Sequence, residues 1–231
     1  MVEFVQAIKK PFSDLKTLGI GAIIGAIPIV NMFISGYGAK TAEDVMGKKN
    51  KLRAWKLEDA VEYIIKTIMM IVIQIIYMIV PMVIIAVGFG SALMAALPVI
   101  MSNPNDITAI TNAILPSLMV GGPIIIIGAI LLLIAAFLLP MAIMKWLKKG
   151  KLGAAFSLGS VIKNALTMDY VISLIVLWVY AIILMIIAGI INTVLAFIPV
   201  VGWILGMVVM GGVAFALTTT NFTVLAQVVK D

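Results

Sequence analysis

Side chains that commonly carry out catalysis are scarce in this sequence. None of its 231 residues is Cys or His, so thiolate chemistry, disulfides, the commonest general base and the commonest zinc ligands are all missing. Glu58, Asp59 and Glu62 stand close enough to bind a cation, but their spacing is more typical of a solvated helix face. The sequence has no Walker loop, nucleophile elbow or paired-carboxylate motif. We therefore predict that the protein is not an enzyme and that it has no catalytic residue, metal site or cofactor.

Polar side chains without charge inside the long apolar stretches are the next candidates. They are Gln74, Asn192, Thr219 and Asn221. Such side chains usually form hydrogen bonds between packed membrane helices, each contributing about 0.6 to 2 kcal/mol. Lining a membrane cavity is the alternative role. The same stretches contain no ionisable residue, which argues against a proton-coupled carrier.

The elements that position these residues must lie in lipid. Apolar residues make up 64% of the sequence and charged residues only 11%, and a compact fold of this length has too few polar side chains to cover so much apolar surface. The formal net charge of +6 is better explained by lysines on the cytoplasmic side of a membrane than by nucleic-acid binding. We predict an all-α, polytopic membrane protein with a single integral membrane domain over residues 1–231.

Long uncharged stretches predict where the chain crosses the bilayer, since a spanning helix needs roughly 20 apolar residues. Glycine, proline and polar clusters interrupt these stretches at 88–91, 102–106 and 121–123. We predict an external segment over 89–122, with short helices at the membrane interface. The four predicted spans cover residues 66–88, 123–144, 170–195 and 203–227.

Lysine and arginine residues set the predicted orientation. Segments 40–65 and 145–169 are rich in them, whereas segment 89–122 has none. Under the positive-inside rule both basic segments are cytoplasmic. The even number of spans after the first basic segment then places the C-terminus on the cytoplasmic side. Residues 1–16 form a cytoplasmic amphipathic segment in this scheme, so the N-terminus is cytoplasmic as well.

The first apolar stretch, 17–39, lies between two groups of lysines, so a single crossing would put the N-terminal lysines outside. We favour a re-entrant helical hairpin that turns at Pro28 and Asn31; the alternative is a fifth span. Proline has no amide hydrogen to donate, and Asn tolerates turn geometry. The turn sequence Ile-Pro-Ile-Val-Asn has a counterpart in Ile-Pro-Val-Val-Gly, where Pro199 and Gly202 would join the last two spans.

Two further patterns concern packing and lipid. Two pairs of glycines, Gly21 with Gly25 and Gly202 with Gly206, have the spacing that lets helices approach closely, and we favour packing within the chain over contact between copies. A basic elbow continues into an amphipathic helix over 152–167 on the inner leaflet. The candidate ligands for lipid headgroups in this elbow are Lys145, Lys148, Lys149 and Lys151.

Three segments together resemble one membrane family. The first runs from Lys10-Pro-Phe-Ser-Asp14 through residues 20–26 and 27–31 to Gly36-Tyr37-Gly38, the second pairs Trp55 with Asp59, and the third joins Ala154-Ala-Phe-Ser157 to the span at Tyr170. They resemble a mainly archaeal family known as domain of unknown function four-zero-one-three. The resemblance implies a multi-pass protein of a prokaryotic cell membrane. It implies no activity and no site residue.

Two functions remain open at this point. The favoured one is a non-enzymatic scaffold or assembly module that binds membrane lipids or a partner at the cytoplasmic face, the partner being a second copy or another membrane protein. The alternative is a channel or permease subunit that uses the helix breaks at Pro28 and Pro199, because broken helices form transport sites in membranes. Nucleic acid is not an expected partner.

Overall fold

The computed structural model describes residues 2–49, 51–102 and 104–230, and every regular element within these ranges is helical. The chain forms two compact units, unit 1 (Met1–Ile71 and Pro140–Asp231) and unit 2 (Val72–Leu139), whereas the sequence predicts a single membrane domain. The elements are α1 (Phe4–Lys9), η1 (Lys10–Phe12), α2 (Leu15–Ala26), α3 (Met32–Met46), η2 (Leu57–Asp59), α4 (Ala60–Ser102), α5 (Ile107–Lys149), η3 (Leu152–Phe156), α6 (Leu158–Ala165), α7 (Met168–Leu195) and α8 (Val201–Val228).

Four helical segments are long and apolar enough to cross a membrane, as the sequence predicts. They are Leu57–Ser91, Gly121–Lys149, Met168–Leu195 and Val201–Val228. Each is at least 28 residues long, which at 1.5 Å per residue exceeds the hydrocarbon thickness of roughly 30 Å. The protein is therefore an all-helical protein with the character of a multi-pass membrane protein.

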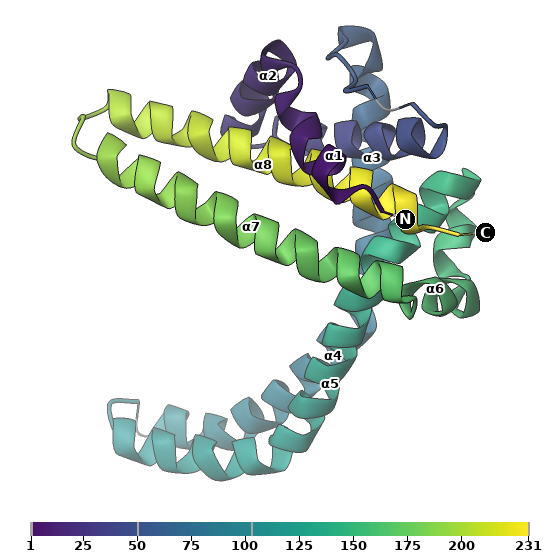
Figure 1. Ribbon diagram of the computed structural model, residues 1–231. Helices are drawn as coiled ribbons and strands as arrows, with labels where there is room; N and C mark the ends of the chain where they lie inside the picture. The colour runs from purple at the N-terminus through teal and green to yellow at the C-terminus, as the bar shows by residue number, and fades with distance from the viewer. Residues whose placement is uncertain (1, 50, 103, 231) are drawn as a thin grey trace. The chain divides into compact units, whose positions relative to one another are not determined.

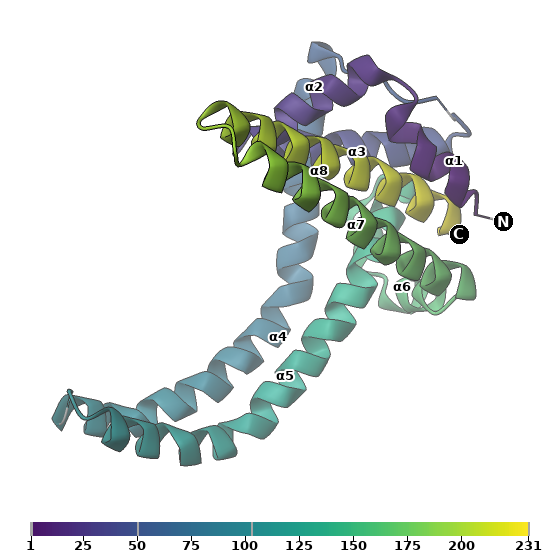
Figure 2. The same ribbon diagram turned by 60° about the vertical axis from the view of Figure 1, so that its left-hand side comes forward.

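In unit 1, α8 is the element around which the others pack. α2, α3 and α7 all lie against it (Figures 1 and 2). A methyl group on Gly25 of α2 would lie 2.7 Å from the carbonyl oxygen of Gly211, and one on Gly21 would collide with the ring of Phe215. Glycine thus lets the backbones of α2 and α8 touch, which is the packing within the chain that the spacing of Gly21 and Gly25 predicts.

An aromatic cluster packs the connection between α3 and α4 onto these helices. Trp55 stacks on Tyr37 with ring centroids 4.4 Å apart, and Tyr63 and Phe215 complete the group. Tyr37, Tyr63 and Phe215 are at most 1% exposed. Gly36 is needed here, because a side chain at this position would collide with the backbone of Tyr63. The cluster joins α3, α4 and α8 through residues that are far apart in the sequence.

The two repeated turn sequences do interrupt the helices, and both hold a β-branched residue at positive φ. α2 ends at Ala26 and α3 begins at Met32, while α7 ends at Leu195 and α8 begins at Val201. Equivalent residues of the two turns, Ile29 (φ 71°) and Val200 (φ 61°), have positive φ values. In the second turn the amide of Val201 donates to the carbonyl of Pro199, which makes Val200 the centre of a γ-turn of the rare, strained kind.

Asn31 and Gly202 therefore have other roles than the turn geometry expected of them. Asn31 has an ordinary helical conformation at the start of α3. Gly202 is helical and buried, and a side chain there would collide with the carbonyl oxygen of Leu195. Residue preferences favour Asn or Gly at positive φ, but here the packing of the flanking helices sets the conformation of β-branched residues instead.

Unit 2 is a helical hairpin formed by the later part of α4 and the earlier part of α5, which curve together (Figure 2). The two helices touch through glycines: a methyl group on Gly88 would lie 2.6 Å from Ile125, and one on Gly121 would lie 2.5 Å from the carbonyl oxygen of Gly88. α4 accommodates Pro81 and Pro98 within the helix.

The expectation of helix ends at 88–91 and 121–123, with short helices between them, is wrong. α4 continues to Ser102 and α5 starts at Ile107, so only the interruption at 102–106 ends a helix. The physical reason is that a glycine costs a helix about 1 kcal/mol but permits close contact with a second helix. The sequence alone does not reveal that partner helix.

Candidate functional site

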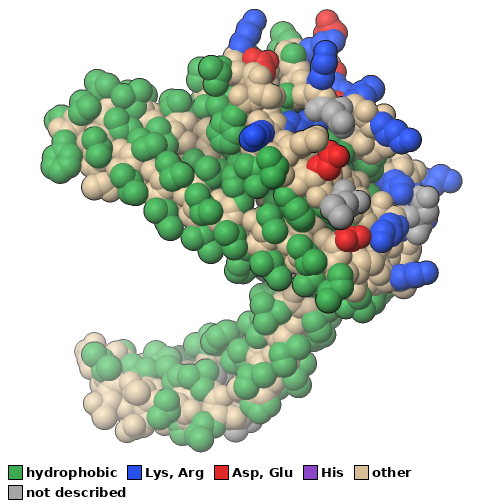
Figure 3. Space-filling model, in the orientation of Figure 1, with side chains coloured by type: hydrophobic (Ala, Val, Ile, Leu, Met, Phe, Trp, Pro, Cys, Tyr) green, Lys and Arg blue, Asp and Glu red, His purple; other side chains and the backbone are tan. Residues whose placement is uncertain are grey.

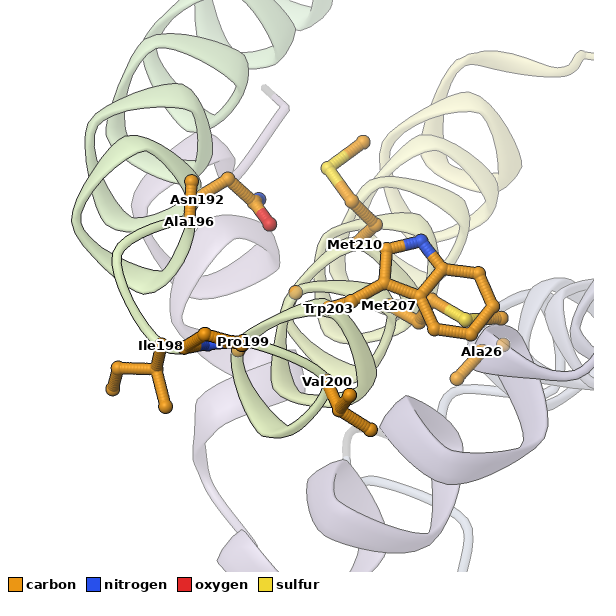
Figure 4. Close-up of a pocket in the computed structure, with 12 residues that line it drawn as sticks. Ala26, Asn192, Ala196, Ile198, Pro199, Val200, Trp203, Met207 and Met210 are labelled. Atoms are coloured by element: carbon orange, nitrogen blue, oxygen red, sulfur yellow. The ribbon is translucent and has the colours of Figure 1, made fainter.

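The candidate site of unit 1 is a pocket of about 570 Å³ beside the turn between α7 and α8 (Figure 4). It contains two of the turn residues singled out in the sequence, Pro199 and Gly202, together with Asn192. Pro28 and Asn31 are exposed and do not line it. The lining residues are Gly25, Ala26, Asn192, Ala196, Ile198, Pro199, Val200, Gly202, Trp203, Gly206, Met207 and Met210.

The pocket exists because α2 ends before it reaches the turn between α7 and α8. The last residues of α2, Gly25 and Ala26, line the pocket on one side, and the first turns of α8 line it on the other. Trp203 of α8 lies between these elements, with its ring toward Ala26 (Figure 4). The indole is 71% exposed, so a wide apolar surface borders the opening.

Asn192 provides the polar side chain of this pocket. Its amide nitrogen donates to the carbonyl of Ala188 one turn earlier at 2.9 Å. Its carbonyl oxygen faces Gly206, where any side chain would collide with it. Gly206 thus lets α8 lie close to the amide of Asn192. The hydrogen bond that Asn192 makes stays within α7, so the hydrogen bond between helices that the sequence favours for it stays a prediction. The remaining lining is apolar apart from backbone atoms, so the pocket suits an apolar ligand better than a hydrated ion.

The other polar candidates lie elsewhere and do not join Asn192 in one site. Thr219 is fully buried and Asn221 half-buried in α8, about 20 Å along the helix from Gly206 at 1.5 Å per residue. Among the described residues, the hydroxyl of Thr219 and the side-chain oxygen of Asn221 have no hydrogen-bond partner. Gln74 is exposed on α4 in unit 2.

The basic elbow has a structural role that the sequence did not reveal. Lys145 is fully buried and donates to the carbonyl of Lys230 at 2.6 Å, while Lys148 donates to the carbonyl of Val229 at 3.3 Å. These ammonium groups satisfy carbonyls at the C-terminal end of α8, where positive charge is favoured. Assigning Lys145 to lipid headgroups is therefore wrong, because its charge is enclosed. Lys149 and Lys151 are exposed.

The amphipathic helix expected over 152–167 is divided between η3 and α6. α6 buries Val161, Asn164 and Ala165 against unit 1. Leu158, Ile162 and Leu166 are 40 to 69% exposed and recur every four residues, so they form an outward apolar stripe. The end of the chain is fixed to this helix, since the amide of Lys230 donates to the side-chain oxygen of Asn164 at 2.8 Å.

An ionic network holds the connection between α3 and α4, and sequence spacing did not reveal it. The guanidinium of Arg53 donates to Asp44 at 2.8 and 3.1 Å and to Asp59 at 2.9 Å. Burial alone would raise the pKa of Asp44, but the hydrogen bonds and charge of Arg53 outweigh this and lower it. The sequence did not link these residues, because Arg53 meets Asp44 and Asp59 only in the folded connection between α3 and α4.

A second set of ion pairs lies beside the first and uses Glu62, one of the acids considered for cation binding. Lys40 contacts Glu62 at 2.6 Å, Lys66 contacts Glu43 at 2.5 Å, and Glu62 also pairs with Lys66 at 3.6 Å. Asp59 and Glu62 are therefore occupied by basic partners. The acids of this segment join α3 to the start of α4, and Glu58 remains exposed.

Comparison with known proteins identifies the family. A family model described as "Protein of unknown function (DUF4013)" matches residues 20–193, from α2 almost to the end of α7. No match was found among curated proteins or among solved structures. The match covers well over half of the chain and agrees with the resemblance carried by the glycine-rich hairpin, Trp55 and Asp59. The chain therefore belongs to the DUF4013 family of proteins of unknown function.

Proposed function

We propose that this protein is a non-enzymatic membrane module that holds a partner or lipid at its cytoplasmic face. The observation that carries the proposal is the division of its surface. In unit 1, the end that carries the turn between α7 and α8 is bare of charge, while lysines, arginines and acids gather at the other end (Figure 3). Large apolar side chains remain exposed along most of α7, which is the pattern of a helix that faces lipid or another membrane helix.

The charged end of unit 1 faces the cytoplasm in this proposal, with both termini. Two basic segments, 40–65 and 145–169, lie at that end, and the positive-inside rule assigns such segments to the cytoplasm. The cell membrane is the expected location.

The hairpin of α2 and α3 is re-entrant in this proposal. It lies along α8 with Gly25 against Gly211. From Gly211 to the start of α8 at Val201 there remain about 15 Å of helix, while the part between Gly211 and Val228 is about 26 Å long. A hairpin that stops there reaches past the middle of the bilayer without crossing it. The backbone of α2 just before the tip, at Gly25 and Ala26, packs against Gly211 of α8. The tip residues 27–29 and 31 are exposed, so at membrane depth a partner has to cover them in this proposal.

We propose that residues 89–122 lie outside the membrane, because α4 and α5 are longer than one crossing requires. α4 and α5 each contain 43 residues, about 65 Å of helix, which is twice the hydrocarbon thickness. Each helix therefore has a portion beyond one crossing, and the joint curvature of the two helices in unit 2 suits a distal portion that bends along the membrane surface (Figure 2).

The exposed apolar stripe of α6 is the proposed contact with the inner leaflet. Leu158 and Ile162 enter the interface, and Lys149, Lys151 and Lys163 lie near headgroup phosphates, each contributing about 1 kcal/mol. A photo-activated cross-linker at exposed Ile162 should attach to lipid or to a partner protein of defined mass in native membranes. The same group at Val161, which is fully buried, should give no such adduct. Equal labelling at both positions would contradict the proposal.

A channel or permease subunit is the second candidate, because two strained turns and a pocket lie near each other in unit 1. Against it, the pocket has one polar side chain, Asn192, and α8 separates it by about 20 Å from the polar residues near Thr219. Flux measurements in sealed proteoliposomes distinguish the candidates. A solute or ion flux that is abolished by Pro28→Ala or Pro199→Ala would overturn the scaffold proposal, whereas partner adducts without flux would support it.

A further inference from the structure

A second pocket of unit 1 lies at the charged end, between the N-terminal helices, the end of α3 and the last turns of α8. Its volume is about 480 Å³, within the range of small-molecule sites. The residues that line it are Glu3, Gln6, Ala7, Lys10, Val45, Lys48, Thr223 and Gln227. None of them belongs to the apolar pocket beside the turn between α7 and α8.

Lys10 is the unusual member of this lining. Its residue is only 7% exposed, and among the described residues no carboxylate forms an ion pair with its ammonium group. Asp44 is the nearest candidate by charge, but its oxygens are occupied by Arg53 and Lys49. Burial lowers the pKa of Lys10, and the more distant negative charge of Asp44 opposes that effect. The ammonium group of Lys10 still reaches solvent within the pocket, although most of the residue is covered. A partly desolvated ammonium group without a close counter-ion is costly, and a bound anion would reduce that cost.

Thr223 presents a second unsatisfied group to the same pocket. The residue is 4% exposed, and its hydroxyl has no hydrogen-bond partner among the described residues. The neighbouring amide of Gln227 is already committed, since it accepts from the amide of Glu3 at 2.8 Å and donates to the carbonyl of Thr223 at 3.2 Å. Lys10 and Thr223, two mostly covered residues with donor groups, therefore line one cavity, with Lys48 exposed beside them.

We propose that this pocket binds a phosphate group, with Lys10 and Thr223 as its inner donors and Lys48 at its entrance. Lysine binds phosphate as a point charge, and hydroxyl groups donate to its oxygens. The carboxylate of Glu3 on the rim limits the net charge of the site, which favours a singly charged phosphodiester over a more highly charged ligand. The site rests on the proposed function in one respect, the cytoplasmic location of the charged end. The phosphate then comes from an inner-leaflet lipid or from a soluble phosphate ester.

The test uses the full chain, purified in a nonionic detergent without phosphate buffer, and calorimetric titration. The probes are dihexanoyl phosphatidylglycerol, glycerophosphoglycerol, which is the same phosphodiester without acyl chains, and dihexanoylglycerol, which has the acyl chains without the phosphate. Binding of the phospholipid alone identifies a lipid headgroup site, and binding of glycerophosphoglycerol as well identifies a site open to soluble esters; both support the proposal. No binding of either phosphate compound, or equal binding of dihexanoylglycerol, would overturn it.

Substitutions localise the site. Lys10→Met keeps the length of the side chain and should weaken phosphate binding about tenfold, and Thr223→Val should weaken it about threefold. Lys9→Met, at an exposed neighbour, is the matched control and should change affinity less than about twofold. Unchanged binding in both Lys10→Met and Thr223→Val, or an equal loss in Lys9→Met, would refute the assignment. Because binding in detergent is independent of orientation and partners, its failure leaves the membrane-module proposal standing, and a failure of partner cross-linking leaves the pocket standing.

Discussion

Gly211→Ala probes the contact on which the hairpin of unit 1 depends. A methyl group at Gly211 would lie 2.6 Å from the amide nitrogen of Ala26, 2.9 Å from the carbonyl carbon of Gly25, and closer still to the carbonyl oxygen of Ala22. All three are backbone atoms and cannot rotate away. To restore ordinary contact, α2 has to move by roughly 1 Å, and a gap of that size removes a quarter to a half of the dispersion energy of the atoms involved.

The expected magnitude follows from two opposing effects. Overpacking of this kind costs about 3 kcal/mol, and the better helix propensity of Ala returns about 1 kcal/mol, so Gly211→Ala should lower the free energy of unfolding by about 2 kcal/mol. Gly212→Ala is the matched control, because its methyl group would meet only the side chain of Ala22 at an ordinary 3.5 Å. The free energy of unfolding of Gly212→Ala should rise by up to about 1 kcal/mol.

The assay is equilibrium unfolding of the full chain in mixed micelles of a mild detergent and dodecyl sulfate, followed by far-ultraviolet circular dichroism. The two variants share the same change in the unfolded chain, so the difference between them reports the packed state. We expect the free energies of unfolding of Gly211→Ala and Gly212→Ala to differ by about 3 kcal/mol. Equal stabilities, or a stabilised Gly211→Ala variant, would refute the close packing of α2 on α8.

Three further variants test other parts of the structure. Val200→Gly should raise the free energy of unfolding by about 1 kcal/mol in the same assay, because glycine adopts the positive φ of the γ-turn without strain; a loss of stability would contradict the strained turn. Gly88→Ala should destabilise the hairpin of α4 and α5 by about 1 to 2 kcal/mol, whereas Gly90→Ala, which would meet no other atom within 4 Å, should not. Arg53→Gln should lower the free energy of unfolding by about 2 kcal/mol at neutral pH. Asp44 has a lowered pKa in the folded protein, so its ion pair stabilises the fold above the ordinary aspartate pKa of about 4. The effect of Arg53→Gln should therefore shrink as the pH falls below that value, and a pH-independent cost would be evidence against the ion pair.

Much of the helical architecture was predictable, because the length and charge of apolar segments are local properties of the sequence. The four candidate spans and the breaks near Pro28 and Pro199 follow from them. The roles of Gly88 and Gly121 did not, because the same residue type serves as a helix end or as a contact between helices. Which role applies depends on whether a second helix lies opposite, and that is a tertiary property.

The candidate sites were predictable only in part, for a related reason. Asn192 and Gly202 were identified from polarity and turn chemistry, and they meet in one pocket. Lys145 and its acceptor, the carbonyl of Lys230, are 85 positions apart, so no local pattern distinguishes this buried lysine from the exposed Lys149. The pocket around Lys10 had no sequence signal, since its residues come from three separate segments of the chain.

The sidedness of the charged segments is the central claim of this account, and the absence of native cysteine makes it directly measurable. Single cysteines at the exposed positions Glu3, Lys56, Lys163 and Val200 would be treated with an impermeant maleimide on intact cells and again after permeabilisation. We predict that Val200→Cys reacts from outside, and that Glu3→Cys, Lys56→Cys and Lys163→Cys react only once the membrane is opened. Labelling of Glu3→Cys from outside would show that α2 and α3 cross the membrane as a fifth span. Labelling of Lys56→Cys and Lys163→Cys from opposite sides of the membrane would contradict the whole arrangement.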